Sequence, residues 1–136
     1  TPHEGEFARL TGCPLPVQDR LAAARDFSRG HGCVLVLKGA GTVTAAPDGS
    51  AWINATGNPG MAKGGSGDVL AGMTAALLGQ KHLRQEGRDN IPELVYSAVC
   101  LHGLAGDLCA QRLGEYGMLP SDLIEALPEI LREWTE

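Results

Sequence analysis

The segment GNPGMAKGGSGDVLAG, residues 57–72, constrains the fold of this chain more than any other stretch. It holds six glycines and leads at once into an apolar run. A glycine inside a helix costs roughly 1 kcal/mol relative to alanine, so the segment is locally unfavourable for regular structure. Local stability therefore does not explain it. The pattern predicts a loop that brings its backbone close to a ligand and then starts a helix.

Charge and hydropathy argue against two classes of partner. The chain has 136 residues, about one ordinary domain, with 11 basic and 16 acidic residues and a net charge of −5. It has no basic block, so we expect no nucleic acid partner. The longest apolar run, near Val69–Gly79, is shorter than the roughly 20 residues of a membrane span, so we expect no membrane partner.

The cysteines predict neither a metal site nor a disulfide framework. They form no CxxC pair and no Cys/His cluster with zinc spacing, so we expect no metal-ligating residues. We expect free thiols in a reducing cytoplasm instead. The four are Cys13, Cys33, Cys100 and Cys109.

The first part of the chain alternates helix and strand signals. Apolar spacing predicts a helix over Pro14–Gly30. The continuous apolar run Cys33–Lys38 predicts a strand that is buried on both faces. A hairpin follows, with strands at Thr42–Ala46 and Ala51–Asn54 around a turn at Pro47–Ser50.

The second part is predicted to be helical. Asn54–Gly67 is expected to be a loop and Gly79–Asn90 a second one. The predicted helices run from Ser66 or Gly67 to about Leu78, from Pro92 to about Leu113, and from Ser121, as N-cap, to about Trp134. The order predicts an α/β fold. One or two buried strands cannot form a doubly wound sheet, so we expect much of the sheet upstream of Thr1.

The segment Gly64–Asp68 predicts an anion site. The first N–H groups of a helix lack helical partners and lie at the positive end of its dipole. The sequence matches neither the GxxxxGK[ST] phosphate loop nor a GxGxxG dinucleotide motif. Asp68 stands at the anion site itself, where a carboxylate repels phosphate. It is either a base for a hydroxyl proton or an acid that offsets the helix dipole.

A weaker motif, Lys38–Thr42, follows the buried strand. Ligands of α/β sheets tend to lie at the carboxyl ends of strands, where Lys38 can meet a phosphate and Thr42 can donate a hydroxyl. The alternative is a lysine that extends from a strand into a tight glycine turn.

Three motifs together resemble the ADP/ATP-dependent NAD(P)H-hydrate dehydratases. They are TPHEGEFARL (residues 1–10), KGAGT (38–42) and the glycine-rich segment 57–72, and the tail LHGLAGDLCAQRLGEYGMLPSDLIEALP (101–128) is similar as well. The resemblance covers nearly the whole chain. It implies a ribokinase-like three-layer α/β/α fold, with residues 1–136 as the C-terminal portion of the dehydratase domain. In this family an NAD(P)H-hydrate epimerase domain often precedes that domain.

The resemblance implies a reaction and a set of site residues. ADP, which we expect over ATP, would phosphorylate the hydroxyl of hydrated NADH or NADPH in the presence of Mg²⁺, and loss of phosphate would restore the dinucleotide. The family also implies a homo-oligomer. Asp68 would be the base and contact the substrate together with His3. The nucleotide would be held by Lys38, Gly39, Ala40, Gly41, Thr42 and Gly67, and the anion hole formed by Gly64, Gly65, Ser66 and Gly67.

One position departs from the family pattern. The family usually reads TPHPGE, and Glu4 stands here in place of the second proline. Proline fixes φ near −65°, so we expect a less rigid segment around His3. Without the resemblance, His3 reads as an ordinary loop histidine before a helix. We also expect half a domain to have little activity alone and to expose apolar sheet surface.

Two other functions stay open on the sequence. One is a ribokinase-like kinase of a small alcohol, such as a vitamin precursor, which shares the glycine–aspartate motif but not the other two motifs. The other is a non-catalytic nucleotide-binding module.

Overall fold

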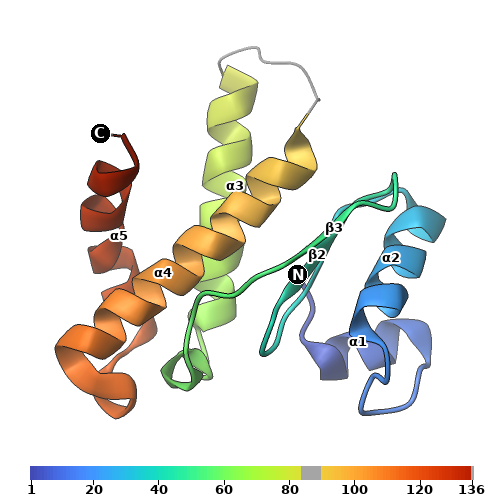
Figure 1. Ribbon diagram of the computed structural model, residues 1–136, viewed down its shortest axis with the longest axis horizontal. Coiled ribbons are helices and arrows are strands. Elements are labelled where there is room, and N and C mark those ends of the chain that lie inside the picture. Colours follow the sequence, from blue (N-terminus) through green and yellow to red (C-terminus); the bar gives the residue numbers. More distant parts are fainter. Residues whose placement is uncertain (84–89, 136) are drawn as a thin grey trace. The chain divides into compact units, whose positions relative to one another are not determined.

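The computed structural model describes residues 1–83 and 90–135 of the chain (Figure 1). These residues belong to two compact units. The first comprises Thr1–Asn54 with Asn90–Tyr96, and the second Ala55–Asp89 with Ser97–Glu136. In chain order the elements are α1 (Glu4–Thr11), α2 (Arg20–His31), β1 (Leu35–Leu37), β2 (Val43–Ala45), β3 (Ala51–Ile53), the 3₁₀ turn η1 (Pro59–Met61), α3 (Ser66–Leu83), α4 (Ile91–Gly117) and α5 (Pro120–Thr135).

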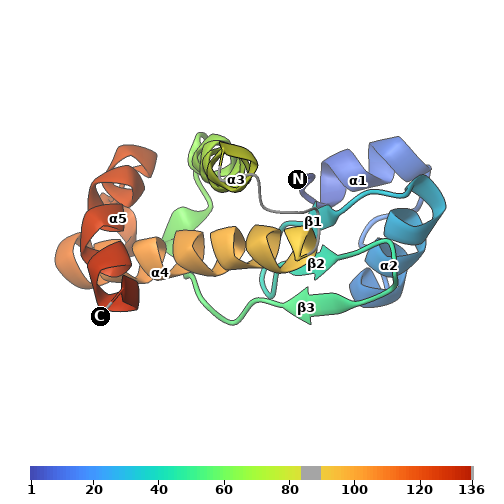
Figure 2. The same ribbon diagram turned by 90° about the horizontal axis from the view of Figure 1, so that it is seen from above.

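The first unit is built on a three-stranded antiparallel sheet in the order β1-β2-β3. Helix α2 packs against β1 and β2 (Figure 2). Val36 pairs with Thr44, which pairs in turn with Trp52, and Trp52 stacks on Tyr96 at the start of α4. All three residues of β1 are buried, which confirms the prediction of a strand covered on both faces. The core between sheet and helices consists of Phe7, Ala24, Leu35, Leu37, Val43 and Ala45.

The second unit is helical. Helices α3 and α5 pack against each other, and the core draws on α4, α5 and Met118, which lies between these two helices. The buried residues of this core are Leu101, Ala105, Cys109, Met118, Leu123, Ala126 and Ile130. All three helices predicted for this part of the chain are present as α3, α4 and α5.

The predicted helix over Pro14–Gly30 is wrong at its start. Helix α2 begins at Arg20, because the Asp19 side chain accepts the N–H of Ala22 at 2.9 Å and caps it. Gly30 lies inside the helix, and Gly32, with φ of 61°, ends it. Helix α1 was not predicted as a separate element.

The ends of α3 and α4 also differ from the predicted ones. The predicted loop over Gly79–Asn90 is wrong for its first residues, since α3 continues to Leu83, and residues 84–89 lie outside the described part. Helix α4 passes Leu113 and bends at Gly114, which has φ of 72° and ψ of 155°.

Two smaller predictions are wrong as well. Ser121 is not the N-cap of α5, which starts at Pro120. The Asp122 carboxylate accepts the N–H of Leu119 at 2.6 Å there. The predicted loop Asn54–Gly67 contains the 3₁₀ turn η1.

We expect Gly103→Ala to destabilise the protein. A Cβ on this buried residue of α4 would lie 2.0 Å from Thr56 Oγ1 and 2.8 Å from the Thr56 carbonyl carbon. Overpacking of this kind costs about 1–3 kcal/mol. Gly79→Ala in α3 is the matched control, because its Cβ would meet no atom within 4 Å. Urea unfolding should show a loss for the first variant and none for the second. Equal stability of the two variants would contradict the close approach of α4 to Thr56.

Candidate active site

The predicted site residues fall into two groups, one in each unit. His3 and Lys38–Thr42 lie in the first unit, and Gly64–Asp68 lies in the second. Within the first unit, His3 and Lys38 are brought together by a parallel bridge, in which the Lys38 N–H donates to the Pro2 carbonyl at 2.8 Å. Within the second, Ser66 begins α3, as predicted.

The start of α3 exposes several backbone donors. Gly65 has φ of 101°, a conformation that favours glycine, and turns the chain into the helix. The N–H of Ser66 donates to the Lys63 carbonyl at 3.2 Å, and that of Asp68 to the Gly65 carbonyl at 3.1 Å. Within residues 1–83 and 90–135, the N–H groups of Gly64, Gly65 and Gly67 have no acceptor. They are therefore available to an anion.

Asp68 lies in the first turn of α3 and is exposed. Its carboxylate has neither a hydrogen-bond donor nor a cation against it in the described residues. The neighbouring Ser66 is buried, and its carbonyl lies 2.9 Å from Nε2 of the buried His102. Because a carbonyl oxygen can only accept, this contact assigns the proton to Nε2. The backbone beside Asp68 is thus fixed, while the carboxylate itself is free.

Asp107 of α4 holds the first part of the glycine-rich segment. One carboxylate oxygen accepts the N–H of Gly57 at 2.9 Å, and the other accepts the side-chain amide of Asn58 at 3.0 Å. The amide oxygen of Asn58 in turn accepts the N–H of Gly60 at 3.0 Å. This chain of bonds ties the segment to α4 before it reaches Gly64.

Lys63 holds the middle of the same segment. Its Nζ donates to the carbonyls of Glu115, Tyr116 and Met118 at 3.1, 3.0 and 2.5 Å. These carbonyls belong to the last turn of α4 and the residue after it, where carbonyl groups lack helical partners. The ammonium group is therefore a cap for α4 and an anchor for the residues that precede Gly64.

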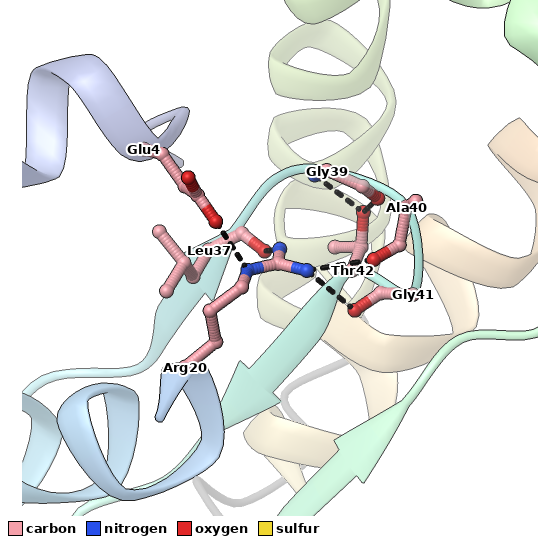
Figure 3. Close-up of polar contacts among 7 residues, drawn as sticks. All are labelled: Glu4, Arg20, Leu37, Gly39, Ala40, Gly41 and Thr42. Atoms are coloured by element: carbon pink, nitrogen blue, oxygen red, sulfur yellow. Dashed lines mark hydrogen bonds and ion pairs between the residues drawn. The ribbon is translucent and has the colours of Figure 1, made fainter. Parts of the chain in front are cut away.

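The turn Lys38–Thr42 is closed by its own hydroxyl (Figure 3). Thr42 Oγ1 accepts the Gly39 N–H at 3.3 Å and donates to the Gly39 carbonyl at 3.0 Å. The hydroxyl predicted to meet a nucleotide is thus already engaged within the turn. The Lys38 ammonium group lies 3.9 Å from a Glu6 carboxylate oxygen.

His3 is the N-cap of α1. Its Nδ1 accepts the Glu6 N–H at 3.2 Å, and the Glu6 carboxylate accepts the His3 N–H at 2.7 Å. This hydrogen bond from the His3 backbone lowers the pKa of Glu6 below its ordinary value of 4.5. Glu4, which replaces the proline of the family pattern, forms an ion pair of 3.1 Å with Arg20.

Sequence reasoning missed three anchoring residues, Arg20, Lys63 and Asp107. Arg20 contacts the turn 38–42 from α2 and Asp107 contacts residues 57–58 from α4, so neither contact is local in sequence. Lys63 had a signal, since it is a single cation within a glycine-rich loop, whose carbonyl groups need donors.

Neither a metal cluster nor a membrane-spanning helix is present among the described residues. No group of three His, Cys, Asp or Glu side chains among residues 1–83 and 90–135 is arranged to hold a metal ion. In the same residues, no helix is long and apolar enough to cross a bilayer.

Comparison with known proteins gives a consistent result. A family model described as NAD(P)H-hydrate dehydratase matches residues 1–129. The whole chain is 46% identical to a bifunctional NAD(P)H-hydrate repair enzyme of Moorella thermoacetica and covers 25% of it. An ADP-dependent (S)-NAD(P)H-hydrate dehydratase of Bacillus subtilis is 37% identical over 98% of the chain, which covers 47% of that relative.

Solved structures agree with the sequence relatives. An ADP/ATP-dependent NAD(P)H-hydrate dehydratase from Bacillus subtilis, co-crystallized with ATP/Mg²⁺, superposes with a TM-score of 0.86 at 37% identity, over 97% of this chain and 46% of that one. A ribokinase-like superfamily protein of Enterococcus faecalis gives a TM-score of 0.79 at 34% identity, over 98% of this chain and 43% of that one. The ribokinase-like fold expected from the motifs is therefore confirmed, and the chain spans about half the length of these proteins.

Proposed function

Since the chain belongs to the NAD(P)H-hydrate dehydratase family, we propose that the full-length protein restores hydrated NADH and NADPH to the reduced dinucleotides. A phosphoryl group passes from ADP or ATP to the hydroxyl of the hydrated nicotinamide ring. Phosphate then leaves, the neighbouring ring carbon loses a proton, and the ring double bond returns. The observation that carries the proposal is the free carboxylate of Asp68 beside the unpartnered N–H groups of Gly64, Gly65 and Gly67, within a segment that fits the family.

Asp68 takes the proton of the ring hydroxyl as that oxygen attacks phosphorus. The backbone donors of Gly64, Gly65 and Gly67 stabilise the charge on the transferring group. Ser66 belongs to the same proposed anion hole, but its N–H already donates to the Lys63 carbonyl. The three glycines are therefore the principal donors.

In this proposal the turn Lys38–Thr42 and Gly67 hold the adenine nucleotide, and His3 contacts the hydrated dinucleotide. His3 is half of a capping box, so its ring is oriented before any ligand arrives. Mg²⁺ commonly keeps several waters and binds through substrate phosphates, so the nucleotide itself can supply its main ligands. When bound, it neutralises charge on the phosphates.

The proposal extends to the protein as a whole. The described cysteines are free thiols, which suits a reducing compartment such as the cytoplasm. Assembly into a homo-oligomer and an epimerase domain upstream stay predictions. The Moorella relative is named as bifunctional, which supports looking for that second activity.

Repair of hydrated NADH tests the proposal. The full-length protein is incubated with hydrated NADH, Mg²⁺ and either ADP or ATP, and the return of reduced-nicotinamide absorbance is followed. We expect recovery that requires the nucleotide, faster with ADP. Failure with both nucleotides would overturn the proposal, and consumption of nucleotide with a small alcohol would replace it with a kinase activity.

A further inference from the structure

Arg20 connects three segments of the first unit (Figure 3). It is the first residue of α2, and its side chain is 20% exposed. One terminal nitrogen donates to the Ala40 carbonyl at 2.6 Å and, more weakly, to the Gly41 carbonyl at 3.4 Å. The other terminal nitrogen donates to the Leu37 carbonyl at 3.0 Å. Nε forms an ion pair with the Glu4 carboxylate at 3.1 Å, and this carboxylate offsets the charge of the guanidinium.

These contacts decide where the peptide groups of the turn point. In a trans peptide unit, the C=O and the N–H of the following residue point in opposite directions. Because the Ala40 and Gly41 carbonyls face Arg20, the N–H groups of Gly41 and Thr42 point away from it. Neither N–H has an acceptor in the described residues. The guanidinium therefore holds the Ala40 and Gly41 carbonyls on one side of the turn, and the Gly41 and Thr42 N–H groups lie on the other.

Gly39 allows the guanidinium to lie this close. A Cβ at this position would be 2.7 Å from a terminal nitrogen of Arg20, and φ of 153° there is one that L side chains rarely adopt. The position of Arg20 thus explains why the first glycine of KGAGT, Gly39, has no side chain.

We propose that Arg20 is a positioning residue for the nucleotide, which acts by orienting the peptide groups of Lys38–Thr42 so that the Gly41 and Thr42 N–H groups meet the anionic part of ADP or ATP. This inference rests on the proposed function, which assigns that turn to the nucleotide. Arg20 does not touch the ligand in this role. A planar fork with several donors suits the task, whereas a lysine offers one ammonium group on a flexible stem.

The test compares Arg20→Ala and Arg20→Lys with the unsubstituted full-length protein. Calorimetric titration with ADP and with ATP measures nucleotide binding directly, and steady-state kinetics measures KM for hydrated NADH. We expect both variants to bind nucleotide at least about tenfold more weakly, equivalent to about 1.4 kcal/mol, with KM for hydrated NADH within about twofold. Arg29→Ala is the matched control, because Arg29 lies on the same helix but packs on Gly49, at the other end of β2.

Four results separate the possibilities. Nucleotide affinity within twofold of the unsubstituted protein in Arg20→Ala would overturn the inference. Full affinity in Arg20→Lys would also overturn it, because positive charge alone would then suffice. A parallel loss of nucleotide affinity, substrate affinity and thermal stability would overturn it in favour of a general folding role. If the unsubstituted protein binds nucleotide but repairs no hydrated NADH, the proposed function fails, while selective loss of nucleotide binding in the Arg20 variants still supports the inference.

Discussion

Asp68→Asn should abolish repair of hydrated NADH while leaving nucleotide binding nearly intact. The substitution keeps the size of the side chain and removes its ability to accept a proton. General bases contribute typically 10²–10⁴-fold to a rate, so we expect turnover to fall by about a thousandfold. The carboxylate makes no hydrogen bond or ion pair within the described residues, so the fold should not lose such an interaction.

The measurement combines turnover, calorimetric titration with ADP, and thermal unfolding. Asp26→Asn makes the same chemical change at an exposed position of α2 and should leave all three unchanged. Retention of more than a tenth of the activity in Asp68→Asn would show that Asp68 is only an acid that offsets the dipole of α3. Loss of nucleotide binding together with turnover would show a binding role instead of a base.

Lys63→Met should destabilise the protein and reduce its activity. Methionine has a similar length and no charge, so the carbonyls of Glu115, Tyr116 and Met118 lose their donor together. Hydrogen bonds to charged groups contribute about 1.5–3 kcal/mol, and we expect a loss of free energy of unfolding in that range. Residues Gly64–Asp68 follow directly, so the donors at the start of α3 should lose their fixed position as well.

Urea unfolding and turnover measure the two effects of Lys63→Met. Lys81→Met makes the same substitution elsewhere in the same unit without touching those carbonyls, and it is the control for the loss of a lysine charge. A drop in both measurements for Lys63→Met, beyond that of Lys81→Met, is the expected pattern. Unchanged stability would show that the last carbonyls of α4 are satisfied without Lys63. Lower stability with full activity would show that Lys63 caps α4 but does not position the donors at the start of α3.

Local patterns determined the elements that depend on neighbours in sequence. Cys33–Lys38 contains the buried strand β1 because a continuous apolar run between glycines leaves few alternatives. The hairpin followed from its turn residues, and Ser66 began α3 because glycines before it cannot hold a helix. The family, and with it the fold, was readable because three motifs occur in order along one chain.

The boundaries of the helices were less predictable, because they depend on which side chain forms the capping hydrogen bond. Asp19 starts α2 at Arg20 instead of near Pro14, since its carboxylate reaches the Ala22 N–H. Gly79 was expected to end α3, yet the helix continues to Leu83. A single glycine costs only about 1 kcal/mol in a helix, and tertiary packing readily exceeds that.

The sequence by itself determined which residues are proposed to carry the chemistry, Asp68 with its glycines and the turn Lys38–Thr42, because each motif is contiguous and its backbone properties are local. Only the tertiary structure decided how they are held. Arg20 reaches the end of β1 and the turn across 17 to 21 positions, and Asp107 and Lys63 make their bonds across 49 to 55 positions. Such partners are selected by the packing of helices and strands, and no local pattern records them.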